Sequence, residues 1–193
     1  DPLKNVVLLN QEKPVLTPDQ QRVWDTLEQT LRESRNGVSQ RPHLLEGVTG
    51  SGKTEIYLRA VEDVLKVGKS AIVLVPEISL TPLAVQRFLT RFPGKVGLIH
   101  SKLTPGERYD TWRRARAGLI SVVIGPRSAL FTPLPNLGLI VADECHDDSY
   151  YQADPAPAFN AVRVAARYSQ ICGCPLLAGS ATPDVVQQYH AAN

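Results

Sequence analysis

The chain has 193 residues, which fits a single domain and is long enough to bury a substantial core. Hydrophobic residues at 43% and charged residues at 21% argue against a disordered chain, and the net charge of +2 is too mild to indicate a nucleic-acid binder by itself. No apolar run approaches the roughly 18 residues of a membrane span and the first residues lack the basic start of a signal peptide, so we expect a cytoplasmic protein without a membrane partner.

The amino-terminal part of the chain divides into a lead-in and a first helix. Residues 1–15 show no sustained periodicity and are predicted to be a linker, which leaves residues 16–193 for one lobe. Thr17-Pro18-Asp19 has the N-cap and first-turn proline of a helix start, and predicts an amphipathic helix that runs to about Arg35 and ends at Asn36-Gly37. The chain contains no methionine, and we expect it to be part of a longer protein.

Apolar runs with the length of buried strands alternate with helix-length polar segments along the rest of the chain. Such alternation predicts an α/β fold with a mostly parallel sheet and helices on both faces, whose ligands lie at the carboxyl ends of the strands. The predicted strands are His43–Glu46, Ser70–Val75, Val96–Ile99, Ser121–Ile124, Leu137–Ala142 and Pro175–Ala178. The predicted helices are Lys53–Val67, Ser79–Phe92, Thr104–Ala117 and Pro157–Gln170.

A glycine-rich segment between the first strand and the next helix has the spacing G-x-x-x-x-G-K-S/T of a phosphate-binding loop. Glycines allow the loop amides to turn inward on a polyanion at a helix N-terminus. Lys53 is expected to reach the β- and γ-phosphates, and the Thr54 hydroxyl to bind magnesium. The loop residues expected to hold the nucleotide are Gly47, Thr49, Gly50, Ser51, Gly52, Lys53 and Thr54.

Basic residues surround the aromatic pair Tyr109 and Trp112 in the predicted helix Thr104–Ala117. Only Glu107 and Asp110 balance them locally. Two interpretations stay open: a solvated helix face with Trp112 packed inward, or a contact with DNA. The basic residues are Lys102, Arg108, Arg113, Arg114 and Arg116.

The predicted strand Leu137–Ala142 ends in two carboxylates, Asp143 and Glu144, followed by Cys145 and His146. At a strand end that faces the nucleotide, Asp143 is placed to hold magnesium and Glu144 to position and deprotonate the attacking water. Adjacent acids could instead form a solvated turn, but the phosphate loop upstream favours catalysis. His146 could sense the γ-phosphate or pack against a neighbour.

The last predicted strand is followed by two hydroxyl residues, Ser180 and Thr182. They could hydrogen-bond the acidic motif and relay the state of the nucleotide, or simply cap a turn. Just before this strand, Cys172 and Cys174 are separated by one residue, whereas zinc ligands are usually separated by about two to four. We interpret these cysteines as buried thiols.

The ordered set of a phosphate loop, Asp-Glu-x-His and Ser-Ala-Thr resembles the first lobe of superfamily 2 helicases. Within this superfamily, the chain resembles the primosomal replication-restart helicases most specifically in residues 74–82, His100-Ser101 and residues 125–140. This resemblance covers nearly the whole chain from Leu16 onward. The resemblance implies a RecA-like lobe that uses ATP and Mg²⁺, in a full protein that unwinds DNA 3′ to 5′ at stalled forks. It also implies fork and single-stranded DNA, the primosome and single-strand-binding proteins as partners, a monomer, and zinc only outside this chain.

The same resemblance assigns residues outside the two main motifs. Gln20 corresponds to a glutamine that reads adenine, although it could be an ordinary polar helix residue. Ser79, Thr81, Arg127 and Ser128 are implied to line a DNA track through contacts that position a strand without reading its sequence; Arg127 could also be a plain surface charge.

The chain departs from the family pattern at four places. Cys145 stands where a second glutamate is usual, Pro126 replaces a threonine, Tyr151 replaces a lysine, and residues 158–163 lack the usual charges. These changes motivate a second hypothesis, a protein that binds forks and recruits partners but has lost helicase activity. For this chain alone we expect little ATP hydrolysis, because the arginine that completes such sites comes from a second lobe.

Overall fold

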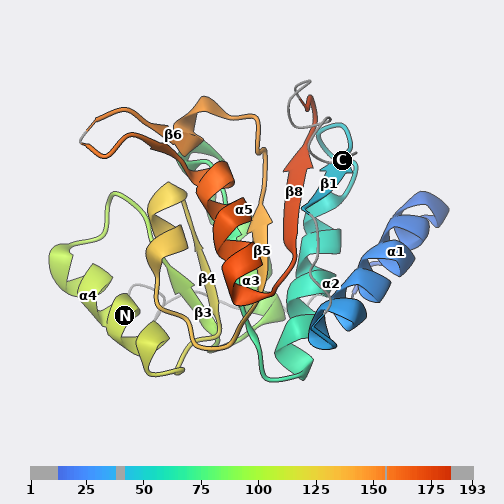
Figure 1. Ribbon diagram of the computed structural model, residues 1–193, viewed down its shortest axis with the longest axis horizontal. Coiled ribbons are helices and arrows are strands. Elements are labelled where there is room, and N and C mark those ends of the chain that lie inside the picture. The colour runs from blue at the N-terminus through green and yellow to red at the C-terminus, as the bar shows by residue number, and fades with distance from the viewer. Residues whose placement is uncertain (1–12, 38–41, 155, 184–193) are drawn as a thin grey trace.

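The computed structural model describes residues 13–37, 42–154 and 156–183 and places a twisted sheet between layers of helices (Figure 1). Within this part of the chain, six strands form one parallel sheet in the order β1-β8-β5-β2-β4-β3. The predicted α/β class is therefore confirmed. The strands are β1 (His43–Glu46), β2 (Ser70–Leu74), β3 (Val96–Leu98), β4 (Val122–Gly125), β5 (Leu137–Ala142) and β8 (Leu176–Ser180).

Five α-helices in the described residues connect or precede these strands. Their starts follow capping rules: the Thr17 hydroxyl accepts a hydrogen bond from the Gln20 amide at 3.3 Å, and prolines occupy the first turns of the first, third and fourth helices. The helices are α1 (Pro18–Arg35), α2 (Lys53–Lys66), α3 (Pro82–Arg91), α4 (Pro105–Arg116) and α5 (Ala161–Cys172).

Side chains of the central strands alternate between two cores. Ala71 and Val73 of β2 pack with α1, α2 and α3 on one face, whereas Ile72 and Leu74 pack with α5 and Leu130 on the other. Because side chains alternate along a strand, a continuous apolar run is the pattern required of a sheet covered on both faces. Figure 1 shows α5 in front of the sheet and α2 and α3 behind it.

Two predicted helices are shorter than expected, and short elements take their place. The segment predicted to begin a helix at Ser79 instead forms a 3-10 turn, η1 (Glu77–Ser79), because the Thr81 cap and Pro82 set the start of α3. The helix predicted from Pro157 begins at Ala161, where the Asn160 side chain caps it. Before it lies an unpredicted antiparallel pair, β6 (Tyr151–Gln152) and β7 (Phe159–Asn160); η2 (Arg127–Phe131) and η3 (Asp148–Tyr150) are also unpredicted.

The prediction of buried thiols is wrong for Cys172, which is exposed, and holds for Cys174, which is buried. Cys172 is the last residue of α5 and is exposed there, so the general preference of free cysteines for burial does not hold at this position. Among the described residues no group of three or more His, Cys, Asp or Glu side chains could hold a metal ion. In the same residues, no helix combines the length and apolar character needed to cross a membrane.

Candidate nucleotide site

The glycine-rich loop joins β1 to α2 at the carboxyl end of the sheet. Gly50 and Gly52 adopt positive φ angles of 83° and 88°, which L side chains rarely adopt, and Gly52 is the N-cap of α2 without a side-chain cap of its own. The Gly47 amide donates to the carbonyl of Ser180 at 3.1 Å, which fixes the start of the loop to β8. The loop therefore lies at the amino terminus of α2, the end of a helix at which anions bind favourably.

Lys53 is held inside the loop. Its side chain is 8% exposed, and its Nζ donates to the carbonyls of Gly47 at 2.6 Å and Val48 at 3.4 Å. The same Nζ lies 3.7 Å from Oε1 of Glu144. The cation therefore lies between the loop and the acidic motif, where phosphate oxygens could replace the weaker carbonyl acceptors.

Gln20 brings the start of α1 against the loop. Its Nε2 donates to the Ser51 carbonyl at 2.8 Å, while its Oε1 accepts a hydrogen bond from the Thr17 amide at 3.0 Å. A Cβ atom at Gly52 would lie 2.3 Å from this Nε2, so the contact depends on the glycine. Gln20 is thus beside the loop, and its contact with adenine stays a prediction.

Asp143 follows β5 and directs its carboxylate at α2. Oδ1 accepts hydrogen bonds from the Tyr57 hydroxyl at 2.9 Å and from the Glu144 amide at 3.0 Å. Burial raises the pKa of the Asp143 carboxyl above its usual range, while the hydrogen bond from Tyr57 acts in the opposite direction. Carboxylate and hydroxyl oxygens are the ligands that Mg²⁺ prefers, so Asp143 and Thr54, on the first turn of α2, fit this ion.

Tyr57 is the residue at this site that the sequence reasoning missed. Its side chain is 1% exposed, and a Cβ atom at Gly179 would lie 1.6 Å from its hydroxyl oxygen. Burial, followed by the charge of Asp143, raises the pKa of Tyr57 far above its usual value, so the hydroxyl stays protonated and donates. The available signal was its place one helical turn after Lys53, on the face of α2 that must point inward.

The acidic motif and the Ser-Ala-Thr segment are hydrogen-bonded to each other. Oγ of Ser180 lies 2.7 Å from Nδ1 of His146 and accepts a hydrogen bond from the Thr182 amide at 3.1 Å. Nδ1 of His146 is also 3.7 Å from Oε2 of Glu144. Glu144 itself has a φ of 45°, the left-handed region that favours glycine. The residues predicted to bind and sense the nucleotide are therefore adjacent, as a relay requires.

The residues predicted to line a DNA track lie at the carboxyl ends of β2 and β4. Ser79 belongs to η1, and the Thr81 hydroxyl accepts a hydrogen bond from the Ala84 amide at 3.2 Å, which caps α3. NH1 of Arg127 donates to the carbonyls of Ser149 at 2.9 Å and Tyr151 at 3.2 Å, beside exposed Ser128. Arg127 is therefore an anchor for the segment after the acidic motif, and its contact with DNA stays a prediction.

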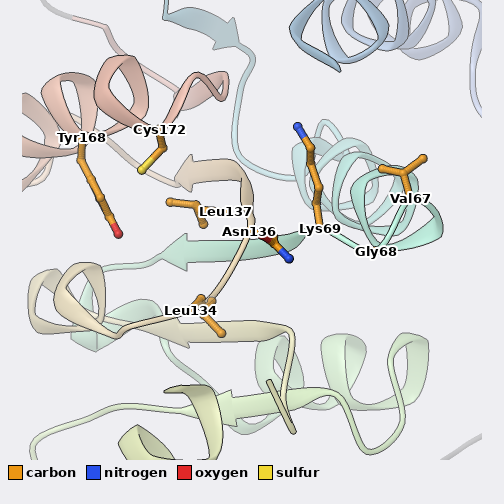
Figure 2. Close-up of a pocket in the computed structure, with 8 residues that line it drawn as sticks. All are labelled: Val67, Gly68, Lys69, Leu134, Asn136, Leu137, Tyr168 and Cys172. Atoms are coloured by element: carbon orange, nitrogen blue, oxygen red, sulfur yellow. The ribbon is translucent and has the colours of Figure 1, made fainter. Parts of the chain in front are cut away.

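A pocket of about 520 Å³ lies away from this site (Figure 2). It is lined by residues that precede β2, that precede or begin β5, or that lie on α5, at the amino ends of the strands. It is therefore a separate feature from the nucleotide site, whose loops all follow strand carboxyl ends. The lining residues are Val67, Gly68, Lys69, Leu134, Asn136, Leu137, Tyr168 and Cys172.

The parallel sheet, the glycine loop at a helix start and the acidic strand end define a RecA-like phosphate-loop lobe. Residues 17–189 match the family model described as "DEAD/DEAH box helicase", and the chain belongs to this family.

Two curated relatives carry the description "Replication restart protein PriA". The protein from Synechocystis sp. is 48% identical over 94% of this chain and 21% of its own length, and that from Bacillus subtilis is 45% identical over 95% and 22%. The resemblance to primosomal replication-restart helicases is thereby confirmed. The chain spans about a fifth of the length of these relatives.

Solved helicase structures share the fold. The structure described as "RecG bound to three-way DNA junction" has a TM-score of 0.64 and 26% identity over 92% of this chain and 22% of that chain. The helicase domain of Pyrococcus furiosus Hef has a TM-score of 0.59 at 20% identity, over 93% of this chain and 38% of that chain, and shows the fold alone.

Proposed function

We propose that residues 16–193 form the ATP-binding first lobe of a longer DNA-dependent ATPase and 3′–5′ DNA helicase that acts in replication restart at stalled forks. The observation that carries the proposal is the meeting of Lys53, Asp143 and Glu144 beside the glycine loop, with Nζ of Lys53 at 3.7 Å from the Glu144 carboxylate. The named relatives support the biological setting.

The chemistry assigned to this lobe is hydrolysis of the γ-phosphate of ATP. Loop amides and Lys53 bind the phosphate oxygens, and Thr54 and Asp143 would hold Mg²⁺, which neutralises phosphate charge when bound. Glu144 positions a water molecule and accepts its proton while the water oxygen bonds to phosphorus and the bond to ADP breaks. Its carboxylate is suited to this task because it lies next to both Lys53 and His146.

The link from chemistry to movement is assigned to His146, Ser180 and Thr182. Because Oγ of Ser180 contacts both the imidazole of His146 and the amide of Thr182, a shift at the γ-phosphate passes directly to the segment after β8. The proposed partners are single-stranded and forked DNA, primosome components and single-strand-binding proteins. The proposed form is a cytoplasmic monomer, with any zinc held by other parts of the full protein.

The site is tested in the full-length protein with fork DNA. Lys53→Ala removes the cation at the phosphates and should abolish ATP-dependent unwinding, whereas Lys66→Ala, an exposed lysine on the same helix, should not. Glu144→Gln should retain ATP binding and lower turnover by about 100- to 10,000-fold, the usual contribution of a general base. Normal ATP hydrolysis by a folded Lys53→Ala protein would refute the assignment of the loop.

The second hypothesis, a recruitment protein without helicase activity, is motivated by Pro126 and by residues 158–163, but the family model and the named relatives do not favour it. Those residues form β7 and the start of α5, with Asn160 capping the helix through the amides of Val162 and Arg163 at 2.9 and 3.1 Å. The altered segment is therefore compatible with an intact nucleotide site. Absence of DNA-stimulated ATP turnover in the full-length protein, with ATP binding retained, would favour this hypothesis.

A further inference from the structure

The helix α4 covers the β3 edge of the sheet and has one orientation dictated by its packing. Thr111 and Ala115, one turn apart, are 5% and 0% exposed. A Cβ atom at Gly97 in β3 would lie 3.1 Å from the methyl group of Thr111, so helix and strand are in close contact. The opposite side of α4 must therefore face away from the sheet.

Four residues at helical spacing form this outer side: Tyr109, Trp112, Arg113 and Arg116, which we call the basic–aromatic face. Tyr109 is 65% and Trp112 38% exposed, so of the two interpretations left open from the sequence, the one with Trp112 packed inward does not hold. The Arg116 guanidinium carbon lies 5.5 Å from the centre of the Trp112 ring, a cation–π contact. Both aromatic rings are thus partly exposed to solvent, and that of Trp112 lies beside a guanidinium group.

The charge of this region is unbalanced. Lys102 and Arg108 are exposed next to the face and add to its two arginines. Two acids lie nearby. Glu107 accepts hydrogen bonds from the amide and the hydroxyl of Thr104 in the capping box, both at 2.9 Å. Asp110 forms an ion pair with Arg113 at 3.0 Å. Asp110 thus offsets Arg113, and the remaining basic side chains leave an excess of positive charge in this region.

The loop before α4 contacts the segment predicted to hold the DNA strand. The Ser101 amide, in the loop before α4, donates to Oε1 of Glu77 at 3.0 Å, and Glu77 begins the turn that carries Ser79. In Figure 1, α4 lies at the β3 end of the sheet and α1 at the opposite end. The predicted track and α4 are therefore neighbours on the β3 side of the sheet.

We propose that the basic–aromatic face of α4 binds the phosphodiester backbone of DNA beyond the motor track, an inference that rests on the proposed function. Guanidinium groups match phosphate oxygens in geometry and charge, and exposed aromatic rings stack on bases or sugars without reading sequence. Single strands and duplex arms share this backbone chemistry. The face would hold one arm of a fork without selecting its sequence.

The test measures how DNA affinity of the full-length protein depends on salt. The variant is Arg113→Gln with Arg116→Gln, and the matched control is Arg22→Gln with Arg32→Gln, two exposed and ion-paired arginines on α1. Each lost phosphate contact should lower the slope of log affinity against log salt by about 0.9 on duplex and about 0.7 on single strands. If α4 binds duplex, the slope measured for the double variant on a blunt duplex should therefore fall by about 1.8. If α4 binds single strands, the slope on a single-stranded oligonucleotide should fall by about 1.4.

The lysine pair Arg113→Lys with Arg116→Lys keeps the charge and should restore most of the slope, which separates a charge contact from a folding defect. Slopes equal to wild type in the glutamine pair would overturn the inference and return α4 to a solvated helix face. Wild-type protein that binds no DNA would overturn the proposed function as well, so the two failures are distinguishable.

Discussion

Removing the hydroxyl of Tyr57 should weaken both magnesium binding and the fold. Tyr57→Phe deletes one of the two donors to Oδ1 of Asp143 and leaves the Glu144 amide as the other. A hydrogen bond to a charged group contributes about 1.5–3 kcal/mol, so the melting temperature should fall by roughly 3–12 °C for a lobe of this size. Loss of a partner that orients a metal ligand usually costs about 10- to 100-fold in metal affinity, and we expect that loss here.

Tyr150→Phe is the matched control for this experiment. Tyr150 is also 1% exposed, but its hydroxyl donates to the backbone carbonyl of Asp143 at 2.7 Å and not to the carboxylate. Binding of a fluorescent ATP analogue, titrated with Mg²⁺ in the full-length protein, gives the apparent magnesium constant beside the melting curve. If Tyr57→Phe and Tyr150→Phe lose similar stability and have the same apparent magnesium constant as each other, the hydroxyl of Tyr57 contributes only to stability. Its role in orienting the Asp143 carboxylate is then refuted.

Three further outcomes are expected from the same geometry. Gly179→Ala places a Cβ atom 1.6 Å from the Tyr57 oxygen and should destabilise the lobe by about 1–3 kcal/mol or more, measured by denaturant unfolding. Ser180→Ala should retain ATP hydrolysis while unwinding per ATP falls, because the contact with the imidazole is lost; equal losses of both would contradict a relay. Hydrogen bonds from Ser101 lower the pKa of the Glu77 carboxyl. The hydrogen bonds between Glu77 and Ser101 therefore stabilise the fold above the ordinary glutamate pKa, and this stability is lost as pH falls through the lowered value. Glu77→Gln should remove that part of the loss of stability in acid.

The sheet and the phosphate loop could be predicted because their signals are local. The continuous apolar run of β5 is buried throughout, and the boundaries Leu137–Ala142 are those expected from sequence. The loop from Gly47 to Thr54 depends on residue types at fixed spacing, so its position between β1 and α2 also follows from sequence. Both bounds of helix α4 lie within one residue of the prediction, and a capping box marks its start.

Other features depend on contacts between distant residues. The two-residue strands β6 and β7 are too short to show periodicity. Arg127 finds its carbonyl acceptors more than twenty residues away, at Ser149 and Tyr151, which no local pattern encodes. The role of Tyr57 arises only when α2, β5 and β8 meet. The left-handed backbone conformation of Glu144 could not be predicted from sequence either, because a glycine would adopt it with less strain.

The order of strands in the sheet also has a consequence for biosynthesis. Strand β8 is the last described strand to be translated, yet it lies between β1 and β5 and joins them. Within the described sheet β1 pairs with β8 and with no other strand, and the Gly47 amide donates a hydrogen bond to the Ser180 carbonyl. In a nascent chain, β1 therefore cannot pair into the sheet until Leu176–Ser180 leaves the ribosome. Closure of the long loop between β1 and β8 is expected to be a late and slow step of folding.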